Sequence, residues 1–220
     1  MKLVLASGSQ RRRELLTMCG YDYEIIVSNA DETIDENDPE SFVRALSFRK
    51  AKDVFDRLFA AGRRDFAVIG SDTVVAFQKE GGTKPVIIGK PKDAKDAVRI
   101  LSMLSGKTHR VFTGVSVIAD IPDENAAAQC SLRKKAEIQT ECSITEVTFE
   151  TLSPDEITDY VNSGDPLDKA GSYGIQGPFG MFVREIRGNY FTVIGMPIPV
   201  LYKMLKKIGI LPHGFYERIE

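Results

Sequence analysis

Three consecutive arginines, Arg11 to Arg13, stand at the predicted start of a helix, directly after the small-residue turn Ser7-Gly8-Ser9. The first backbone N–H groups of a helix have no partner inside the helix and favour an anion, and a serine hydroxyl in the turn can cap the helix or bind that anion. Arginine adds planar, permanently charged donors that match phosphate oxygens. The segment therefore predicts a polyphosphate site. The alternative is an ordinary capped helix with a solvated basic edge.

Three charged residues interrupt patterns that otherwise predict burial. Lys50 lies on the apolar stripe of a predicted helix, so it needs an anionic partner or a route to water. Asp72 lies between two apolar, β-like runs, where a carboxylate must be hydrogen-bonded or hold a cation. Lys90 follows the apolar run 86–88 and indicates little by itself. Lys50 can equally be a lysine at the margin of the core, and Asp72 a turn residue at a strand end.

The segment PLDKAGSYGIQG, residues 166–177, has a glycine at every third position of its second half, which allows backbone to approach a ligand closely. It does not match the dinucleotide fingerprint GxGxxG, and no part of the chain matches the phosphate-binding pattern GxxxxGK[ST]. Dinucleotide-binding and kinase-type functions are therefore excluded. The alternative to a ligand loop is a plain turn. The polar groups that the segment would offer are Asp168, Lys169 and Gln176.

The elements that must position these residues alternate between strands and helices, which predicts an α/β sheet protein. Strands are predicted over 2–6, 23–27, 66–69, 73–77, 111–118 and 143–152, with a break at 70–72. Helices are predicted over 10–18, 39–61, 94–104, 154–161 and 197–208, and a hairpin over 181–186 and 190–194. Because the chain contains no linker-like segment and no internal repeat, residues 1–220 are predicted to form one domain. The polar stretch at about 120–140 is predicted to be an insertion-like, mobile surface excursion.

Composition narrows the function classes. The chain has 220 residues, 43% of them apolar and 27% charged, and its net charge of −2 argues against bulk electrostatic binding of nucleic acid. No apolar run approaches the roughly 20 residues of a membrane helix, and the N-terminal run is too short for a signal peptide. Three widely spaced cysteines predict reduced thiols in a cytoplasmic protein, and two histidines argue against a zinc site.

Six segments together resemble the signature blocks of the Maf-like nucleotide pyrophosphatases. They are LASGSQRRREL, GSDTVV, GKP, LSGKTHRVFTG, PLDKAGSYGIQG and GNYFTVIGMP, and they follow the family's order over nearly the whole chain. The resemblance implies an elongated α/β fold similar to that of the inosine triphosphate pyrophosphatases. That fold has a mixed sheet with flanking helices and two lobes around a central cleft. The chain departs from the family's pattern at Gln10, where proline is usual, and in the longer stretch 120–140.

The resemblance also implies an activity, which is metal-dependent hydrolysis of nucleoside triphosphates between the α and β phosphates. Asp72 matches the family's catalytic acidic residue, which is proposed to accept a proton from the attacking water, and Glu32 matches an acidic residue for metal binding or catalysis. The phosphate-handling positions are Ser7, Arg12, Lys50 and Lys90, of which the two lysines are counted as catalytic, and Lys169 matches the lysine of the DKAG motif. Carboxylate ligands such as Glu32 and Asp72 favour Mg²⁺ or Mn²⁺ over zinc.

Three positions divide the family into substrate groups. Here they are Arg11, Thr73 and Gln176, which resemble the group of thymidine and uridine triphosphate pyrophosphatases. The Gln176 amide offers one acceptor and one donor, complementary to uracil or thymine. The family further suggests a homodimer, whereas the net charge and the short apolar runs predict no nucleic-acid and no membrane partner. The alternative function is a nucleotide-binding regulator of cell division without turnover.

Overall fold

The computed structural model describes residues 1–78, 81–82, 84–121 and 136–214. The strands are β1 (Lys2–Leu5), β2 (Tyr23–Ile25), β3 (Phe66–Phe77), β4 (Val86–Ile88), β5 (Thr108–Ala119), β6 (Glu137–Phe149) and β7 (Val183–Arg187). The helices are α1 (Gln10–Met18), α2 (Pro39–Ala60), α3 (Ala94–Leu104), α4 (Pro154–Asn162), α5 (Tyr190–Ile194) and α6 (Ile198–Lys207). Three short 3₁₀ helices connect α4 to β7, namely η2 (Asp165–Asp168), η3 (Ala170–Ser172) and η4 (Pro178–Phe182).

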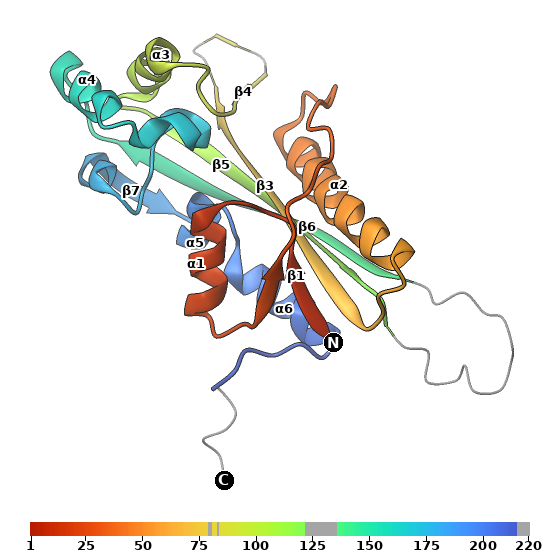
Figure 1. The fold of residues 1–220 in the computed structure, drawn as a ribbon. Helices are drawn as coiled ribbons and strands as arrows, with labels where there is room; N and C mark the ends of the chain where they lie inside the picture. Colours follow the sequence, from red (N-terminus) through yellow and green to blue (C-terminus); the bar gives the residue numbers. More distant parts are fainter. Residues whose placement is uncertain (79–80, 83, 122–135, 215–220) are drawn as a thin grey trace, which may run out of the picture.

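Within the described residues, seven strands form one mixed sheet in the order β2-β1-β3-β5-β6-β7, and β4 pairs with the far end of β3. β1 is parallel to both β2 and β3, whereas the other pairs are antiparallel. The long strands β3, β5 and β6 run through the molecule and give it an elongated shape (Figure 1). The predicted elongated mixed α/β sheet with flanking helices is confirmed.

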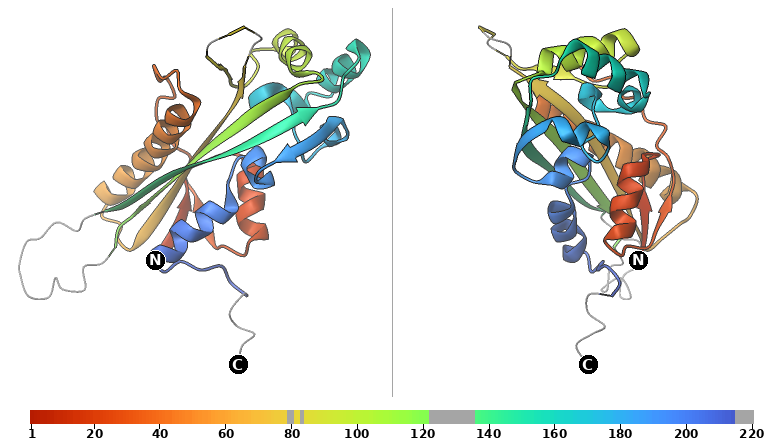
Figure 2. Two further views of the ribbon diagram at one scale, coloured as in Figure 1. Left: turned by 180° about the vertical axis from the view of Figure 1, so that it is seen from behind. Right: turned by 90° about the vertical axis from the view of Figure 1, so that its left-hand side faces the viewer.

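Side chains that alternate along β3 divide the sheet into two faces. Phe66 and Val68 pack against α2, on what we call the α2 face. Ala67 and Ile69 pack against α1 and α6, on the α1 face. Figure 2 shows α2 on one side of the long strands and α1 and α6 on the other. A separate core lies at the opposite end of the strands, where α3 and α4 cover them. Helices therefore cover the sheet near both ends of the long strands.

A capping residue and a proline define the start of α2. The Asp38 carboxylate accepts a hydrogen bond from the Ser41 backbone N–H at 2.8 Å, and Pro39 occupies the first turn, where it removes a donor that would be unpaired. The stripe of the helix is confirmed, because Val43, Leu46 and Val54 are fully or almost fully buried. None of the helices in the described residues has the length and apolar character to cross a membrane.

The predicted break at 70–72 is wrong, because β3 is continuous. Gly70 faces the α2 backbone, where its lack of a side chain allows close packing, and Ser71 is fully buried. The Ser71 hydroxyl donates to the carbonyl oxygens of Gly114 and Gly195, at 2.9 and 3.0 Å. Asp72 therefore lies within a strand and not in a turn at a strand end. Small and polar residues are typical of turns, but here they lie in a buried strand, where the Ser71 hydroxyl has hydrogen-bond partners.

The predicted hairpin at 181–194 is also wrong, because its second half is the helix α5. The Asn189 side chain accepts from the Thr192 N–H at 3.3 Å and caps that helix, and Gly195 ends it with φ = 112°. The strand predicted over 143–152 is β6, which begins at Glu137 and ends at Phe149. Residues 137–140 of the predicted surface excursion therefore lie in a strand. Residues 122–135 of that stretch lie outside the described residues.

Candidate active site

A cleft of ≈ 480 Å³ lies along an open edge of β3. β1 pairs with residues 66–69 of this strand and β4 with residues 75–77, so on this side residues 70–74 pair with neither strand. All ten residues predicted for the site line this cleft, namely Ser7, Arg11, Arg12, Glu32, Lys50, Asp72, Thr73, Lys90, Lys169 and Gln176. Their individual roles stay predictions, but the structure brings together segments up to about 170 residues apart in the sequence.

The cleft reaches both faces of the sheet because it follows the strand edge. Neighbouring side chains of a strand point to opposite faces. Asp72 accordingly meets Lys50 of α2, whereas Thr73 meets Arg12 of α1. One ligand in the cleft can therefore contact a carboxylate and lysine on one face and an arginine and threonine on the other.

Lys50 lies between two carboxylates. Its ammonium is 2.6 Å from Asp72 Oδ1 and 2.9 Å from Glu32 Oε1. The side chains of Lys50 and Asp72 are each 11% exposed, whereas that of Glu32 is 66% exposed. Lys50 is predicted to need an anionic partner or a route to water, and the structure gives it two anionic partners. Removing one member of such a buried pair strongly destabilises the folded protein. Glu32 holds the solvent side of the cluster.

Two glycines allow this close approach of α2. A side chain at Gly70 would meet the Ser47 carbonyl oxygen at 2.2 Å, and one at Gly114 would meet the Val43 carbonyl oxygen at the same distance. Gly114 is the β5 partner of Asp72 in the sheet, and Gly70 precedes Asp72 on the same face. The helix therefore packs on bare backbone next to the catalytic candidate, and Lys50 reaches it from there.

The turn between β1 and α1, where the sequence predicts an anion site, lies at the wall of the cleft. Ser9 is the N-cap of α1, but its side chain makes no capping hydrogen bond, and the turn and first helical residues line the cleft. Ser7 is buried, and its hydroxyl oxygen accepts from the Ser9 N–H at 3.2 Å and from Arg12 at 3.1 Å. The start of α1 thus keeps donors available for an anion.

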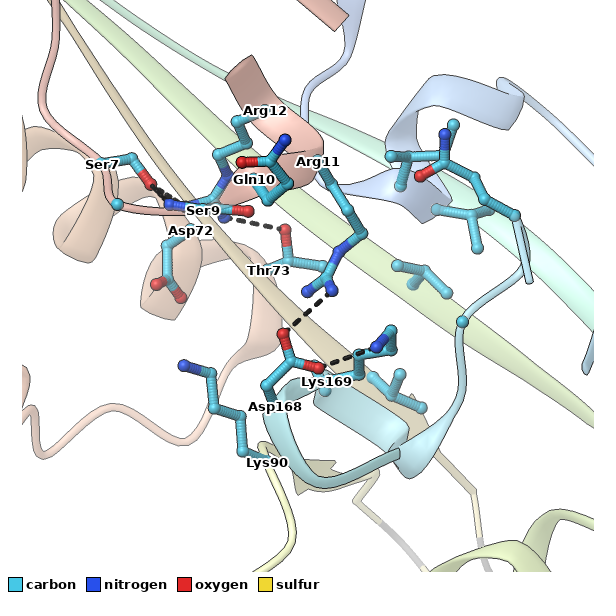
Figure 3. A pocket seen from close by; sticks show the side chains of 18 of the residues that line it. Ser7, Ser9, Gln10, Arg11, Arg12, Asp72, Thr73, Lys90, Asp168 and Lys169 are labelled. Atoms are coloured by element: carbon cyan, nitrogen blue, oxygen red, sulfur yellow. Dashed lines mark hydrogen bonds and ion pairs between the residues drawn. The ribbon is translucent and has the colours of Figure 1, made fainter. Parts of the chain in front are cut away.

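Arg12 is held by three acceptors. Its Nε donates to the Gly195 carbonyl oxygen at 2.8 Å, and its two terminal nitrogens donate to Ser7 at 3.1 Å and to Thr73 at 3.4 Å. Burial lowers the pKa of Arg12, and the nearby Asp72 charge opposes this effect. A guanidinium stays charged in proteins, so the cleft contains a fixed positive group. Figure 3 shows Arg12 beside Ser7 and Thr73.

Lys169 has no free proton in this arrangement. Its ammonium donates to the Asp165 carbonyl oxygen at 2.6 Å, to the Asp165 carboxylate at 3.0 Å and to Asp168 Oδ1 at 2.8 Å. An ammonium has three donors, and all three are used. The structure thus favours a role for Lys169 in shaping the loop, and a contact with phosphate requires one of these bonds to break.

Asp168 connects that loop to α1. Its Oδ2 accepts from Arg11 at 3.1 Å while Oδ1 accepts from Lys169 (Figure 3). Burial raises the pKa of Asp168, but the hydrogen bond from Lys169 and the charge of Arg11 outweigh it, so the pKa lies below its ordinary value. The bridge holds the Arg11 guanidinium over the cleft.

The remaining predicted residues are open to a ligand. Within the described residues, no ion pair or hydrogen bond engages the side chains of Lys90 and Gln176, and both are exposed at the cleft. Figure 3 shows Lys90 extending toward the Asp72 carboxylate. Overall, five cationic side chains and three carboxylates line the cleft, so a polyanion would find an excess of positive charge.

Two glycines that support the site from behind were not predicted from the sequence. Gly195 accepts from both Arg12 and Ser71, and Gly114 lies opposite Asp72. The GNYFTVIGMP and LSGKTHRVFTG segments contain them, so the resemblance was the only available signal. The described residues contain no group of three or more His, Cys, Asp or Glu side chains that could hold a metal ion by themselves.

The fold and the cleft define an α/β protein with a cleft that cationic side chains and carboxylates line together. The sequence pattern of the Maf-like protein family matches residues 2–208, and the chain belongs to this family. A protein of Agathobacter rectalis called dTTP/UTP pyrophosphatase is 39% identical over 217 residues, which cover 95% of this chain and 98% of that protein. A protein of Bacillus thuringiensis with the same name is 42% identical over 210 residues, covering 95% and 96%.

Among solved structures, the chain is similar to the Ham1 protein of Staphylococcus aureus. The sequence identity is 13% and the TM-score 0.44, and the match covers 94% of this chain and 99% of that chain. A likeness at this level carries no conclusion about the site.

Proposed function

We propose that this chain is a nucleoside triphosphate pyrophosphatase that acts on dTTP and UTP. Near-full-length relatives at about 40% identity bear that activity as their name, and this observation carries the proposal. The cleft supports it, because the cations and carboxylates expected for phosphoanhydride hydrolysis line one space. Water adds to the α-phosphorus, the bond to the oxygen that bridges the α and β phosphates breaks, and a nucleoside monophosphate and pyrophosphate form.

Asp72 is the residue that we propose to accept the proton of the attacking water. It is buried, it lies next to the open strand edge, and Lys50 holds one of its oxygens at 2.6 Å. Lys50, Lys90 and Arg12 would neutralise the charge of the phosphates, and the start of α1 with Ser7 would bind a phosphate group. The Lys90 ammonium suits this role best, because a ligand need not displace a partner within the described residues.

A divalent cation, Mg²⁺ or Mn²⁺, fits the two carboxylates of Glu32 and Asp72. Both reach the same ammonium, so their oxygens surround one cationic position. Mg²⁺ is commonly held by one or two carboxylates together with substrate phosphates, which agrees with the absence of a third ligand among the described residues. When bound, the cation supplies charge neutralisation of the triphosphate.

The proposed choice of base depends on Arg11, Thr73 and Gln176. The Gln176 amide can pair with N3–H and a neighbouring carbonyl of uracil or thymine, whereas a carboxylate would only accept, which suits guanine. Asp168 holds Arg11 at the wall of the same cleft that Gln176 lines. The exposure of Gln176 leaves its amide available to the base.

A panel of nucleoside triphosphates with Mg²⁺ and an assay for pyrophosphate tests the proposal. We expect dTTP and UTP to be the preferred substrates, with weaker release from CTP. Preference for purine triphosphates would contradict the base assignment. Tight binding of nucleotide in a calorimetric titration, with the ligand unchanged afterwards, would instead support a regulator that binds without turnover.

A further inference from the structure

A buried chain of hydroxyl groups lies directly behind Thr73. The Thr73 hydroxyl is 3.0 Å from that of Thr113, its partner on β5, and the Thr113 hydroxyl is 2.7 Å from the Thr192 carbonyl oxygen. Thr113 and Thr192 are fully buried, whereas Thr73 lies at the wall of the cleft. The cluster continues to Ser143, whose hydroxyl is 2.7 Å from that of Thr192.

Counting protons fixes the direction of these bonds. A hydroxyl has one proton, and a carbonyl oxygen can only accept, so the Thr113 proton points to Thr192. Thr113 must then accept in its bond with Thr73, and the single proton of Thr73 points away from the cleft. One remaining lone pair of Thr73 faces Arg12 at 3.4 Å, and the other is available. Thr73 therefore presents an acceptor to a ligand.

We propose that Thr113 is a positioning residue for substrate choice, because it keeps Thr73 an acceptor toward the base. This inference rests on the proposed pyrimidine triphosphatase activity. An acceptor at this place can share the N3–H of uracil or thymine with the Gln176 amide oxygen. Cytosine has an unprotonated N3, so the two acceptors would face each other and remain unpaired. Figure 3 shows Thr73 beside Arg11, which is another of the residues that we propose to read the base.

Removing the Thr113 hydroxyl tests the proposal. In Thr113→Val, the Thr73 hydroxyl loses its acceptor and can rotate to donate into the cleft, whereas the Thr192 carbonyl keeps the Gly195 N–H at 3.1 Å. We measure binding of non-hydrolysable α,β-imido analogues of UTP and CTP by calorimetry. The preference for the UTP analogue is expected to fall about tenfold, the effect of one unpaired buried polar group.

Matched variants distinguish an effect of the Thr73 proton direction from an unspecific effect of changing the buried cluster. Thr113→Ser keeps the hydroxyl and should retain the wild-type preference. Ser143→Ala removes a hydroxyl of the same cluster that does not contact Thr73, and it should retain the preference too. Thr113→Ala also removes the hydroxyl and introduces a smaller side chain. It is measured in place of Thr113→Val if that variant does not fold. In a Thr73→Val background, Thr113→Val should change the preference no further.

A preference in folded Thr113→Val or Thr113→Ala within about twofold of the wild type would overturn the role of Thr113, since the lost pairing predicts about tenfold. Equal loss of affinity for both analogues would overturn it as well. Because the readout is binding, failure of the proposed activity is seen separately, as absence of pyrophosphate release from UTP by the wild type.

Discussion

Adding one methyl group at Gly114 tests how the fold positions the catalytic candidates. In Gly114→Ala, the new Cβ would lie 2.2 Å from the Val43 carbonyl oxygen and 2.5 Å from the Val43 carbonyl carbon. Real Cβ contacts essentially never fall below 3.0 Å, so α2 and β5 must separate by at least about 0.8 Å. The obstructing atoms are backbone, so rotation of a side chain cannot relieve the contact.

Two effects follow from this separation. Overpacking of a buried contact costs about 1–3 kcal/mol of the free energy of unfolding. The same movement withdraws Lys50 on α2 from Asp72 on β3, and a misplacement of about 1 Å near the chemistry can lower turnover about 10²-fold. Urea unfolding and pyrophosphate release from UTP measure the two effects separately.

Gly89→Ala is the matched control. It adds the same methyl group close to the cleft, but nothing lies within 4 Å of the new Cβ, and the backbone is not in the left-handed region. We expect wild-type stability and turnover within about twofold, because surface changes without new contacts have small effects. If folded Gly114→Ala has the turnover of this control, the reasoning that α2 must pack on bare backbone is refuted.

Three further predictions follow from the described contacts. Asp72→Asn should lower turnover by about 10² to 10⁴, the usual contribution of an acid–base group, with nucleotide binding largely kept; near-wild-type turnover would remove Asp72 from the catalytic role. Gln176→Glu should lower kcat/KM for dTTP and UTP at least about tenfold, and an unchanged ranking of pyrimidines would contradict the base assignment. Burial lowers the pKa of His109 to about 3, so the folded protein keeps this ring neutral while the unfolded chain takes up a proton below its ordinary pKa of 6.5. The contribution is present above pH 6.5 and lost on acidification toward pH 3, so the unfolding free energy should fall by up to about 1.4 kcal/mol per pH unit more steeply than in His109→Phe, as unfolding measured between pH 7 and pH 4 will show.

Local sequence rules predicted much of the framework. The helices α1 and α3 have the predicted bounds, and α2 begins at the predicted residue, Pro39. Capping residues and apolar spacing act within one helix, so they predict its bounds without knowledge of tertiary contacts. The errors at 70–72 and 190–194 have a common cause, because tertiary partners decide these segments. Ser71 is satisfied by distant carbonyl groups, and a five-residue helix depends on its cap and its packing.

The sequence predicted which residues line the cleft, but it did not predict the hydrogen bonds between them. Lys50 and Asp72 stood out in the sequence because each interrupts an apolar pattern, and the structure pairs them. The saturation of Lys169 depends on how the short 3₁₀ turn folds Asp165 and Asp168 around its ammonium. The proton direction at Thr73 depends on Thr113, which is 40 residues away along the chain. Spacing in a sequence does not specify such contacts, and only the family resemblance placed these residues near one another.

We propose that this protein cuts a pyrimidine triphosphate between its α and β phosphates. Phosphorus NMR of UTP incubated with the pure protein and Mg²⁺ tests it most directly, because the products identify the broken bond. We predict UMP and pyrophosphate in equal amounts, with no UDP at any time. UDP with orthophosphate, or UTP that remains intact, would contradict the account.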